Sequence, residues 1–571
     1  MTILTKAALA AAAPLLLSSS RALAQVPPPT EANTLPVEYE SMEGDALLGH
    51  LSVPMEGDGP FPAVIIIPDW DGVNEMEQIR ATMVTEQWGM VGFAADIYGA
   101  DKQTVSNFTE RIELATLYRS DPILFAERIQ SAVDLIKDHE KVDPEQVALF
   151  GYCFGGTGVL QYGLAGYDGV NAVVSFHGGL SGLPEPNATF VPQVLILSGG
   201  DDDAASQIME MEITLDAANA PWEITRYSNI EHGFTVWSDE RYNAWADTRS
   251  WESAGHFILE SFGVTEFMSA QPEEEIALIA VNYTGVDGQP LTGHLAMPGA
   301  QWQRPLPAVV IFPDWDGVNM YEKERAYALA KEGYVAFAAD IYGSDKQDVP
   351  DIPGRIEEVT KYRSDPDLYV SRMQNAIDVV KGLTDDVNAT EIAIIGYCFG
   401  GSGVVLYSMS NGMDAKVSVP FHGSFQQMPT LQAEMNSYML VLSGGDDDAH
   451  GNQTTMETAF DEGQAEWEIT RYAGVLHGYT SWYSDAYNLV ADARSWESMM
   501  TSFKELLTMP MPSGLNETDT APCVEIAREG VLCPGQQAPV VANSDGDSGA
   551  VTRNILSVSA VVGAAVVALV T

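Results

Sequence analysis

The stretch Gly151-Tyr152-Cys153-Phe154-Gly155-Gly156 lies between a short apolar run and a segment with helical periodicity. In a Gly-x-nucleophile-x-Gly pattern, the central side chain stands on a sharp turn from strand to helix. Glycine is needed on both sides because the turn leaves no room for a Cβ. The start of the following helix stabilises negative charge on sulfur. The hexapeptide therefore predicts a nucleophilic cysteine at the corner of an α/β fold.

A phosphate-binding turn and a structural cysteine fit the hexapeptide less well. A turn that binds a dinucleotide phosphate would carry Gly-x-Gly-x-x-Gly and an acidic residue after the next strand, and this stretch shows neither. A buried structural cysteine would not need the surrounding glycines. The whole hexapeptide recurs at 396–401, which favours a chemical role.

The hexapeptide is one block of a long internal repeat. The offset between copies is 245 residues at most blocks and 244 at two of them. Clear pairs are PAVIIIPDWDGVN (62–74) with PAVVIFPDWDGVN (307–319), SGGDDDA (198–204) with SGGDDDA (443–449), and WEITRY (222–227) with WEITRY (467–472). A period of this length indicates a duplicated domain. We predict one domain over residues 35–264, a second over 273–507, and a linker at 269–275.

Within each copy, short apolar runs alternate with segments of helical periodicity. In the first copy the expected strands are 63–67, 91–95, 147–150, 172–176, 194–198 and 223–227. The expected helices are 75–88, 124–137, 155–164 and 242–262. This alternation predicts an α/β class, with a doubly wound, mostly parallel sheet flanked by helices in each copy.

The partners expected for Cys153 follow it in the chain. In such folds the acid and then the base come after the nucleophile, each on a loop behind a strand. Asp201, Asp202 and Asp203 follow the fifth expected strand, and His232 follows the sixth. The sequence predicts a triad of Cys153, Asp202 and His232, although three adjacent aspartates leave the acid ambiguous by one position.

The second copy keeps the same three groups at the same separations. Cys398 and Asp447 are 49 positions apart, and Asp447 and His477 are 30 apart, as in the first copy. His177 and its counterpart His422 compete for the role of base. Both precede the aspartates, which is the wrong order, so we expect them to line the pocket or to hydrogen-bond a carbonyl.

The net charge of the chain argues against some classes of binding partner. There are 80 acidic and 28 basic residues, for a formal net charge of −52. Such a surface repels nucleic acid and anionic lipid headgroups, which argues against both as partners. Solubility is the simplest reason for the acidity.

Both ends of the chain carry segments typical of processing signals. In residues 1–24, Lys6 precedes a short apolar run and small residues, as in a secretory signal peptide. Residues 509–549 form an expected flexible stalk, and the apolar segment 550–571 follows it. That layout fits a GPI-type lipid-anchor signal, and a C-terminal membrane helix is the alternative. We expect a secreted or cell-surface protein that meets a membrane only through this tail.

Sequons and cysteines agree with secretion. The Asn-x-Ser/Thr acceptors are Asn107, Asn187, Asn282, Asn388, Asn452 and Asn516, which predict a glycoprotein. Cys523 and Cys533 lie in the expected stalk, where an oxidising compartment would let them close a small loop.

The motifs together resemble the dienelactone hydrolase family, and the resemblance spans both repeats almost end to end. It rests on GYCFGG after a strand, the Gly-Gly-x-Asp loop, the His-Gly-aromatic turn and the later RSW helix. It implies two tandem α/β-hydrolase domains, a small lactone or carboxylic ester as substrate, and neither cofactor nor metal. The implied nucleophile, acid and base are the six residues Cys153, Asp202, His232, Cys398, Asp447 and His477.

An oxyanion site and a nearby acid complete the expected site. Backbone N–H groups of Trp70 and Phe154 are the expected oxyanion donors, with Trp315 and Phe399 in the second copy. The family usually carries a glutamate near the thiol. The matching residues here are the shorter Asp69 and Asp314.

The predicted chemistry is acyl transfer through a thioester. The alternative is a tandem module that kept the fold without catalysis and serves as a binding or surface protein. Arg119 and Arg363 recur in the repeats and either hold a substrate carboxylate or form surface ion pairs, and we favour the ion pairs. Several aromatic residues shape an apolar pocket or pack the core: Trp70, Tyr98, Trp237, Trp315, Tyr342 and Trp482.

Overall fold

The computed structural model describes residues 31–187, 192–263, 278–300, 302–410, 412, 414–423, 429–482 and 484–510. Both copies of the repeat belong to one compact unit. We call the copy with strands β1–β8 repeat 1 and the copy with strands β9–β16 repeat 2.

Repeat 1 alternates strands and helices along the chain. Its strands are β1 (Leu35–Glu40), β2 (Ala46–Ser52), β3 (Phe61–Ile67), β4 (Val91–Ala94), β5 (Val142–Tyr152), β6 (Ala172–Phe176), β7 (Gln193–Gly199) and β8 (Trp222–Tyr227). Its helices are α3 (Glu75–Trp88), α4 (Phe108–Ser120), α5 (Pro122–Lys137), α6 (Phe154–Leu164), α7 (Ala205–Ala217) and α8 (Ala244–Ser261).

Repeat 2 has the same order of elements. Its strands are β9 (Ile279–Thr284), β10 (Pro290–Ala296), β11 (Leu306–Phe312), β12 (Val335–Ala338), β13 (Val387–Tyr397), β14 (Val417–Phe421), β15 (Tyr438–Gly444) and β16 (Trp467–Tyr472). Its helices are α9 (Met320–Lys331), α10 (Ile352–Ser364), α11 (Pro366–Lys381), α12 (Phe399–Met409), α13 (His450–Glu462) and α14 (Leu489–Leu506).

The sheet confirms the predicted fold class. In repeat 1 the strand order is β1-β2-β4-β3-β5-β6-β7-β8. The strands from β4 to β8 in this order pair in parallel, whereas β1 and β2 are antiparallel. Repeat 2 mirrors this order, and β8 pairs antiparallel with β16. One sixteen-stranded sheet therefore passes through both repeats.

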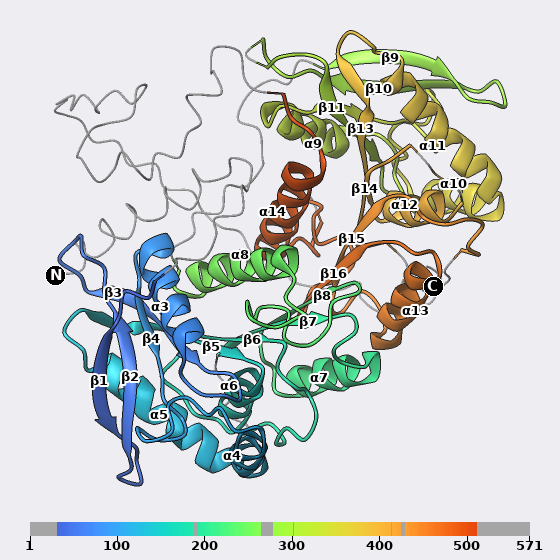
Figure 1. Ribbon diagram of the computed structural model, residues 1–571. Helices are drawn as coiled ribbons and strands as arrows, with labels where there is room; N and C mark the ends of the chain where they lie inside the picture. The colour runs from blue at the N-terminus through green and yellow to red at the C-terminus, as the bar shows by residue number, and fades with distance from the viewer. Residues whose placement is uncertain are drawn as a thin grey trace, which may run out of the picture. The chain divides into compact units, whose positions relative to one another are not determined.

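Helices cover both faces of the sheet in each repeat. In repeat 1, α4, α5, α6 and α7 share a core with Ile65 and Leu149. Helices α3 and α8 share another with Ile66 and Phe150, which are the next residues on the same strands. Because neighbouring residues of a strand point to opposite faces, the two cores lie on opposite sides of the sheet. Figure 1 shows α3 and α8 apart from α4, α5 and α6.

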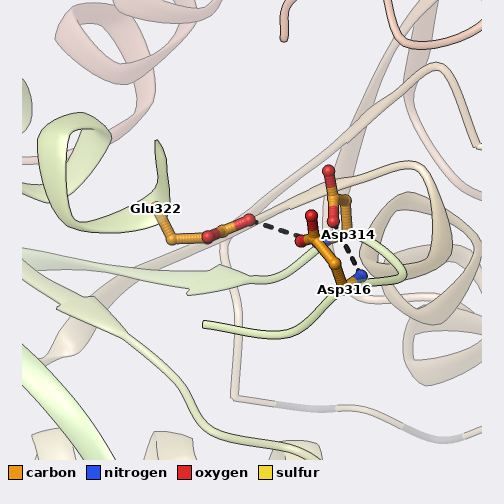
Figure 2. Close-up of side chains that lie close together, drawn as sticks. All are labelled: Asp314, Asp316 and Glu322. Carbon is orange, nitrogen blue, oxygen red and sulfur yellow. Dashed lines mark hydrogen bonds between the residues drawn. The ribbon is translucent and has the colours of Figure 1, made fainter. Parts of the chain in front are cut away.

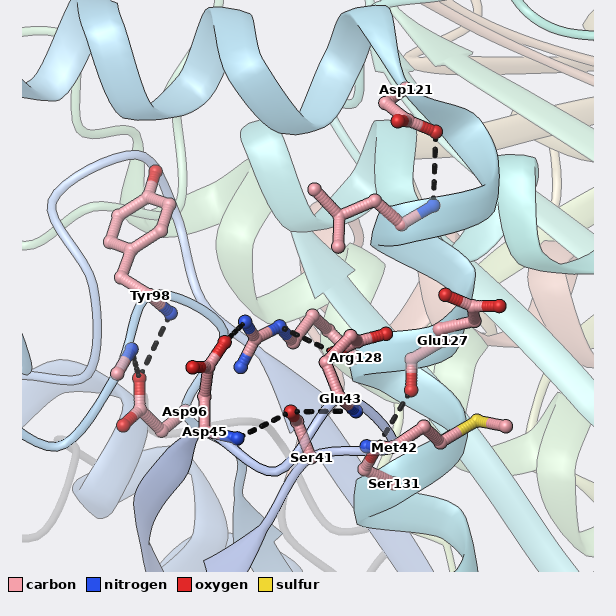
Figure 3. A network of polar contacts seen from close by, with 12 residues as sticks. Ser41, Met42, Glu43, Asp45, Asp96, Tyr98, Asp121, Glu127, Arg128 and Ser131 are labelled. Atoms are coloured by element: carbon pink, nitrogen blue, oxygen red, sulfur yellow. Dashed lines mark hydrogen bonds and ion pairs between the residues drawn. The ribbon is translucent and has the colours of Figure 1, made fainter.

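Strand β1, its hairpin pairing with β2, and helices α4 and α7 escaped the prediction. Strand β1 has few buried side chains, and in α4 only Ala115 and Tyr118 are buried, so their apolar patterns are weak. The hairpin turn is instead held by polar contacts with α5 (Figure 3). Arg128 pairs with Asp45, and Ser131 Oγ accepts the N–H of Met42 at 3.1 Å.

The two terminal segments and the linker lie outside the described residues. They are residues 1–24, the linker at 269–275 and the chain after residue 510, which includes Asn516, Cys523 and Cys533. The predictions made for them stay predictions. No helix among the residues that the structure describes is long and apolar enough to cross a membrane.

Candidate active site

Cys153 stands on the turn between β5 and α6. Its φ of 50° is unusual for a residue with a side chain, and such strain is typical of functional turns. A Cβ at Gly151 would lie 2.1 Å from the Gly155 carbonyl oxygen, and one at Gly155 would lie 2.3 Å from the Ile67 carbonyl oxygen. Both glycines are therefore required, because helix α6 begins directly against β5 and the end of β3.

The structure brings the three predicted side chains of repeat 1 into one hydrogen-bonded chain. His232 Nε2 lies 3.0 Å from Cys153 Sγ, and His232 Nδ1 lies 2.9 Å from Asp202 Oδ1. Cys153 is half-buried, and the His232 side chain is 33% exposed, so solvent reaches the imidazole. A thiol, an imidazole and a carboxylate in this order form a nucleophile, a base and a group that orients the base.

The structure also separates the three adjacent aspartates. Asp201 is exposed, and Asp203 is buried and accepts the Ser198 hydroxyl at 3.0 Å. Asp202 is the aspartate that meets His232. The loop backbone decides this, because three consecutive side chains leave a turn in three different directions.

Repeat 2 reproduces the same chain of contacts. His477 Nε2 lies 2.9 Å from Cys398 Sγ, and His477 Nδ1 lies 2.7 Å from Asp447 Oδ1. Cys398 has a φ of 52°, close to that of Cys153. Both repeats therefore hold a complete cysteine–histidine–aspartate arrangement.

The electrostatics of repeat 1 favour a thiolate. Burial raises the pKa of Cys153, but the hydrogen bond and charge of His232 outweigh it and hold the pKa below the ordinary thiol value. The charge of Arg119 and the N–H of Phe154 add to this lowering. Burial lowers the pKa of His232, yet its hydrogen bonds to Asp202 and Cys153 raise it to about 10. Both shifts favour the thiolate–imidazolium form of the pair over the neutral thiol and imidazole.

The pKa of His477, the triad histidine of repeat 2, is shifted in the same direction as that of His232. Burial opposes protonation of His477, but the charge of Cys398 and the hydrogen bond to Asp447 raise its pKa well above the ordinary value. The aspartate stabilises the imidazolium in both repeats.

His177 and His422 are buried side chains that pack against the triads. The two are 1% and 2% exposed, and burial holds the pKa of each well below the ordinary value, so both rings are neutral. His177 Nε2 lies 2.7 Å from Thr235 Oγ1, and its ring meets the His232 ring edge to face, with centroids 5.1 Å apart. In repeat 2, His422 Nδ1 accepts the N–H of Cys398 at 3.1 Å. These histidines pack beneath the site instead of acting as its base.

Asp69 lies at the end of β3, in the buried loop near the thiol. Burial, the charge of Glu77 and a hydrogen bond shared with the carboxyl of Asp71 raise the pKa of Asp69 well above its usual range. Burial likewise raises the pKa of Glu77 to about 8. The raised pKa favours the neutral form of Asp69, which carries no negative charge.

The matching acids of repeat 2 are drawn in Figure 2. The carboxylate oxygens of Asp314, Asp316 and Glu322 lie within 4.8 Å of one another, a spacing that a metal ion could bridge. Their oxygens already accept backbone N–H groups: Glu322 accepts those of Asn319 at 3.0 Å and Asp314 at 3.3 Å, and Asp314 accepts that of Asp316 at 3.0 Å. The three acids therefore hold the backbone of the loop after β11 in its conformation.

The predicted oxyanion donors come from two adjacent loops. Phe154 opens α6, where the first N–H groups have no acceptor within the helix. Trp70 lies in the loop after β3, and its carbonyl accepts the hydroxyl of Tyr98 at 3.1 Å. In repeat 2, the carbonyl of Trp315 accepts the hydroxyl of Tyr342 at 3.2 Å, and Phe399 opens α12. The tyrosines hold these loops in place, a role that the sequence did not indicate.

The contacts of Arg119 and Arg363 differ from the expected surface ion pairs. Neither forms an ion pair with a carboxylate among the described residues. Arg119 is exposed, and its guanidinium carbon lies 5.8 Å from the centre of the Phe154 ring. The favoured surface ion pair is thus not found within the described part of the chain, and the charge of Arg119 instead helps to lower the pKa of the Cys153 thiol.

Trp237 and Trp482 pack into the core. Arg80 lies over the Trp237 ring at 4.6 Å, and the Trp237 Nε1–H donates to Asp247 at 3.1 Å. Arg325 lies over Trp482 at 4.3 Å in the same way. Both positions therefore support the loop that follows the histidine instead of facing the thiol.

The fold and the geometry of the site define the class of protein. A mostly parallel sheet with helices on both faces carries a nucleophile corner after β5, an acid after β7 and a histidine after β8. That combination is the α/β-hydrolase fold.

Comparison with known proteins identifies the family within this class. The model of the dienelactone hydrolase family matches residues 49–262 and 291–507. The chain belongs to the dienelactone hydrolase family, with two tandem copies, and is an ester or lactone hydrolase.

Individual relatives match one copy at a time. Similar proteins include a "Putative carboxymethylenebutenolidase" of Escherichia coli strain K12, 25% identical over 242 residues that cover 40% of this chain and 88% of the relative. A "Probable 2-oxo-3-(5-oxofuran-2-ylidene)propanoate lactonase" of Bradyrhizobium is 25% identical over 38% of this chain and 90% of the relative. A solved dienelactone hydrolase-like promiscuous phosphotriesterase from metagenomic libraries is 27% identical over 41% of this chain and 100% of its own, with a TM-score of 0.37.

Proposed function

We propose that each repeat hydrolyses a small carboxylic ester or lactone through its cysteine and a thioester intermediate. The observation that carries this proposal is the Cys–His–Asp chain of contacts, present in both repeats. A binding module has no need of a strained thiol that faces an imidazole.

The reaction begins with attack of the Cys153 thiolate on the ester carbonyl carbon. The tetrahedral intermediate carries its negative charge on oxygen, and the N–H groups of Trp70 and Phe154 stabilise it there. When the intermediate collapses, the C–O bond to the alcohol breaks and the leaving oxygen takes the proton of the His232 imidazolium. In a lactone the alcohol and the acyl group remain one molecule.

Water completes the cycle. Neutral His232, oriented by Asp202, accepts a proton from water, and the hydroxide adds to the thioester carbonyl. Collapse of this second intermediate breaks the C–S bond, releases the carboxylic acid and restores the thiolate. The raised pKa of Asp69 favours its neutral form, which would add no negative charge near the thiolate or the intermediate.

A negatively charged group on the substrate fits repeat 1. Arg119 pairs with no described carboxylate, and its charge lowers the pKa of Cys153. The Bradyrhizobium relative carries the name of a lactonase whose substrate is a propanoate. We propose that Arg119 attracts a carboxylate of the substrate toward the thiol.

Secretion and surface attachment are part of the proposal. The apolar N-terminal segment and the apolar tail support it. The sequon asparagines Asn107, Asn187 and Asn282 are exposed, so a glycan could reach them. Expression in a eukaryotic secretory host, with glycosidase treatment, tests this: we expect loss of mass. An unglycosylated product retained inside the cell would contradict it.

The central test uses the variants Cys153→Ala, Cys398→Ala and the double variant. With an activated ester, each single variant keeps the activity of the other repeat, and the double variant falls by about a thousandfold or more. Acid quenching and mass spectrometry should show an acyl group on each cysteine of the unmodified chain. Full activity of the double variant would overturn the proposed mechanism in favour of another nucleophile, and an unmodified chain without activity would favour the binding module.

A further inference from the structure

The contacts between the repeats reach the acid loops of both sites. Strands β8 and β16 pair antiparallel, with Thr225 and Thr470 side chains 3.0 Å apart, and α7 of repeat 1 packs against α13 of repeat 2. Loop 199–203 of repeat 1 carries Asp202, and its counterpart 444–448 carries Asp447. Both loops follow strands next to this junction.

Arg226 of β8 connects loop 199–203 to the other repeat. Its Nη2 donates to the carbonyls of Gly200 at 3.0 Å and Asp203 at 2.7 Å, on either side of Asp202. Its Nη1 pairs with Glu457 of α13 in repeat 2. Arg226 is fully buried, so this carboxylate supplies the counter-charge that keeps the guanidinium in place.

Repeat 2 shows the reciprocal arrangement. Arg471 of β16 donates to the carbonyls of Gly445 at 3.0 Å and Asp448 at 3.4 Å, around Asp447. Its Nε lies 3.0 Å from Glu212 of α7 in repeat 1. Each acid loop is thus tied to an arginine whose carboxylate partner comes from the opposite repeat.

A tryptophan of the opposite repeat closes over each loop as well. A Cβ at Gly200 would lie 3.2 Å from Cη2 of Trp467, and a Cβ at Gly445 would lie 3.2 Å from Cη2 of Trp222. The Asp201 N–H also donates to the Ile230 carbonyl at 3.0 Å, two residues before His232. Movement of the acid loop would therefore change the geometry of the acid and of the base together.

From these contacts we infer that each repeat positions the acid of the other repeat's triad. Arg226 and Glu457 are positioning residues for site 1, and Arg471 and Glu212 are positioning residues for site 2. The inference rests on the proposed function, because it concerns the rate at Cys153 and Cys398. It makes the tandem arrangement a requirement for full activity at either site.

The experiment uses the full chain with one site active at a time. Glu457→Gln is placed in the Cys398→Ala background, which leaves site 1, and in the Cys153→Ala background, which leaves site 2. We expect kcat of site 1 to fall on the order of tenfold to a hundredfold with little change in KM, because a misplaced acid disturbs the base. Site 2 should keep its rate, because its own acid loop is held by Arg471. Glu212→Gln is the mirror variant and should slow site 2 alone.

Two further measurements separate positioning from loss of folding. In Glu457→Gln, weaker contact between Asp202 and His232 should move the alkaline limb of the site 1 pH–rate profile to lower pH. The pair Arg226→Met with Glu457→Met removes both buried charges, so thermal stability should recover while site 1 stays slow. Recovery of the site 1 rate in this pair would overturn the inference.

The remaining outcomes are also decisive. Equal slowing of both sites by Glu457→Gln, or slowing of neither, would overturn the inference while the proposed function stands. Activity absent from both single-cysteine backgrounds, before any further change, would instead remove the proposed function and this inference with it.

Discussion

The two repeats share their triads but differ in the residues around the catalytic histidine. In repeat 1, Arg241 forms a two-fold contact with Asp239, and its guanidinium passes close to Gly233, the residue after His232. The aligned positions of repeat 2 are Ala486 and Ser484. Within one chain, the groups for chemistry were kept while residues near the histidine changed.

A second difference lies on the other side of the thiol. Phe108 of repeat 1 is 65% exposed and meets the Trp70 ring edge to face at 5.5 Å. Its counterpart in repeat 2 is Ile352, which is 50% exposed. Repeat 1 therefore carries the Arg241–Asp239 pair and the aromatic Phe108 where repeat 2 carries Ala486, Ser484 and the aliphatic Ile352. We expect the two sites to prefer different esters.

The largest expected effect tests what the repeats share. Asp202→Asn in the Cys398→Ala background should lower kcat of site 1 by about a thousandfold to ten-thousandfold, because the amide no longer stabilises the imidazolium. Asp447→Asn in the Cys153→Ala background should do the same at site 2. Asp201→Asn is the matched control, since Asp201 is exposed beside Asp202. Comparable losses for Asp201→Asn and Asp202→Asn would mean that the acid was wrongly assigned.

The pH dependence of thiol labelling is the next effect. Because the pKa of Cys153 is lowered, its thiolate persists to lower pH than that of an ordinary thiol, and it is lost as pH falls through the lowered pKa. Iodoacetamide labelling of Cys153, followed by peptide mass spectrometry, should therefore stay fast at pH 7. His232→Ala removes the stabilising partner and leaves burial, so the pKa should rise and labelling at pH 7 should slow. Labelling of both cysteines only after unfolding would show buried structural thiols instead.

The smallest effect tests how the repeats differ. Arg241→Ala should raise KM of site 1 for an anionic ester by about twofold to fivefold, the range expected of an exposed charge. The KM for a neutral ester should not change. Ala486→Arg should lower KM of site 2 for the anionic ester. Equal effects on anionic and neutral esters would exclude a charge-based preference.

Much of the fold followed from local patterns in the sequence. Strand β3 is continuously apolar and helix α5 is clearly amphipathic, and α3 begins and ends at the predicted residues. Strand β1 and the hairpin that it forms with β2 were missed because the hairpin is held by contacts distant in sequence. Arg128 lies 83 positions from Asp45, and no local window contains both.

For the site, the sequence by itself determined the nucleophile corner, the order of acid and base, and their repetition. Those features depend on glycine positions and on strand ends, which are local. Tertiary structure decided which of three aspartates faces His232 and packed the His177 ring against the His232 ring. It brought the charge of Arg119 close enough to lower the pKa of the thiol. It also joined β8 to β16 and set Glu457 against Arg226, 231 positions away. Such pairings depend on how the two folded repeats meet. No repeat or spacing in the sequence indicates which edge strands will pair.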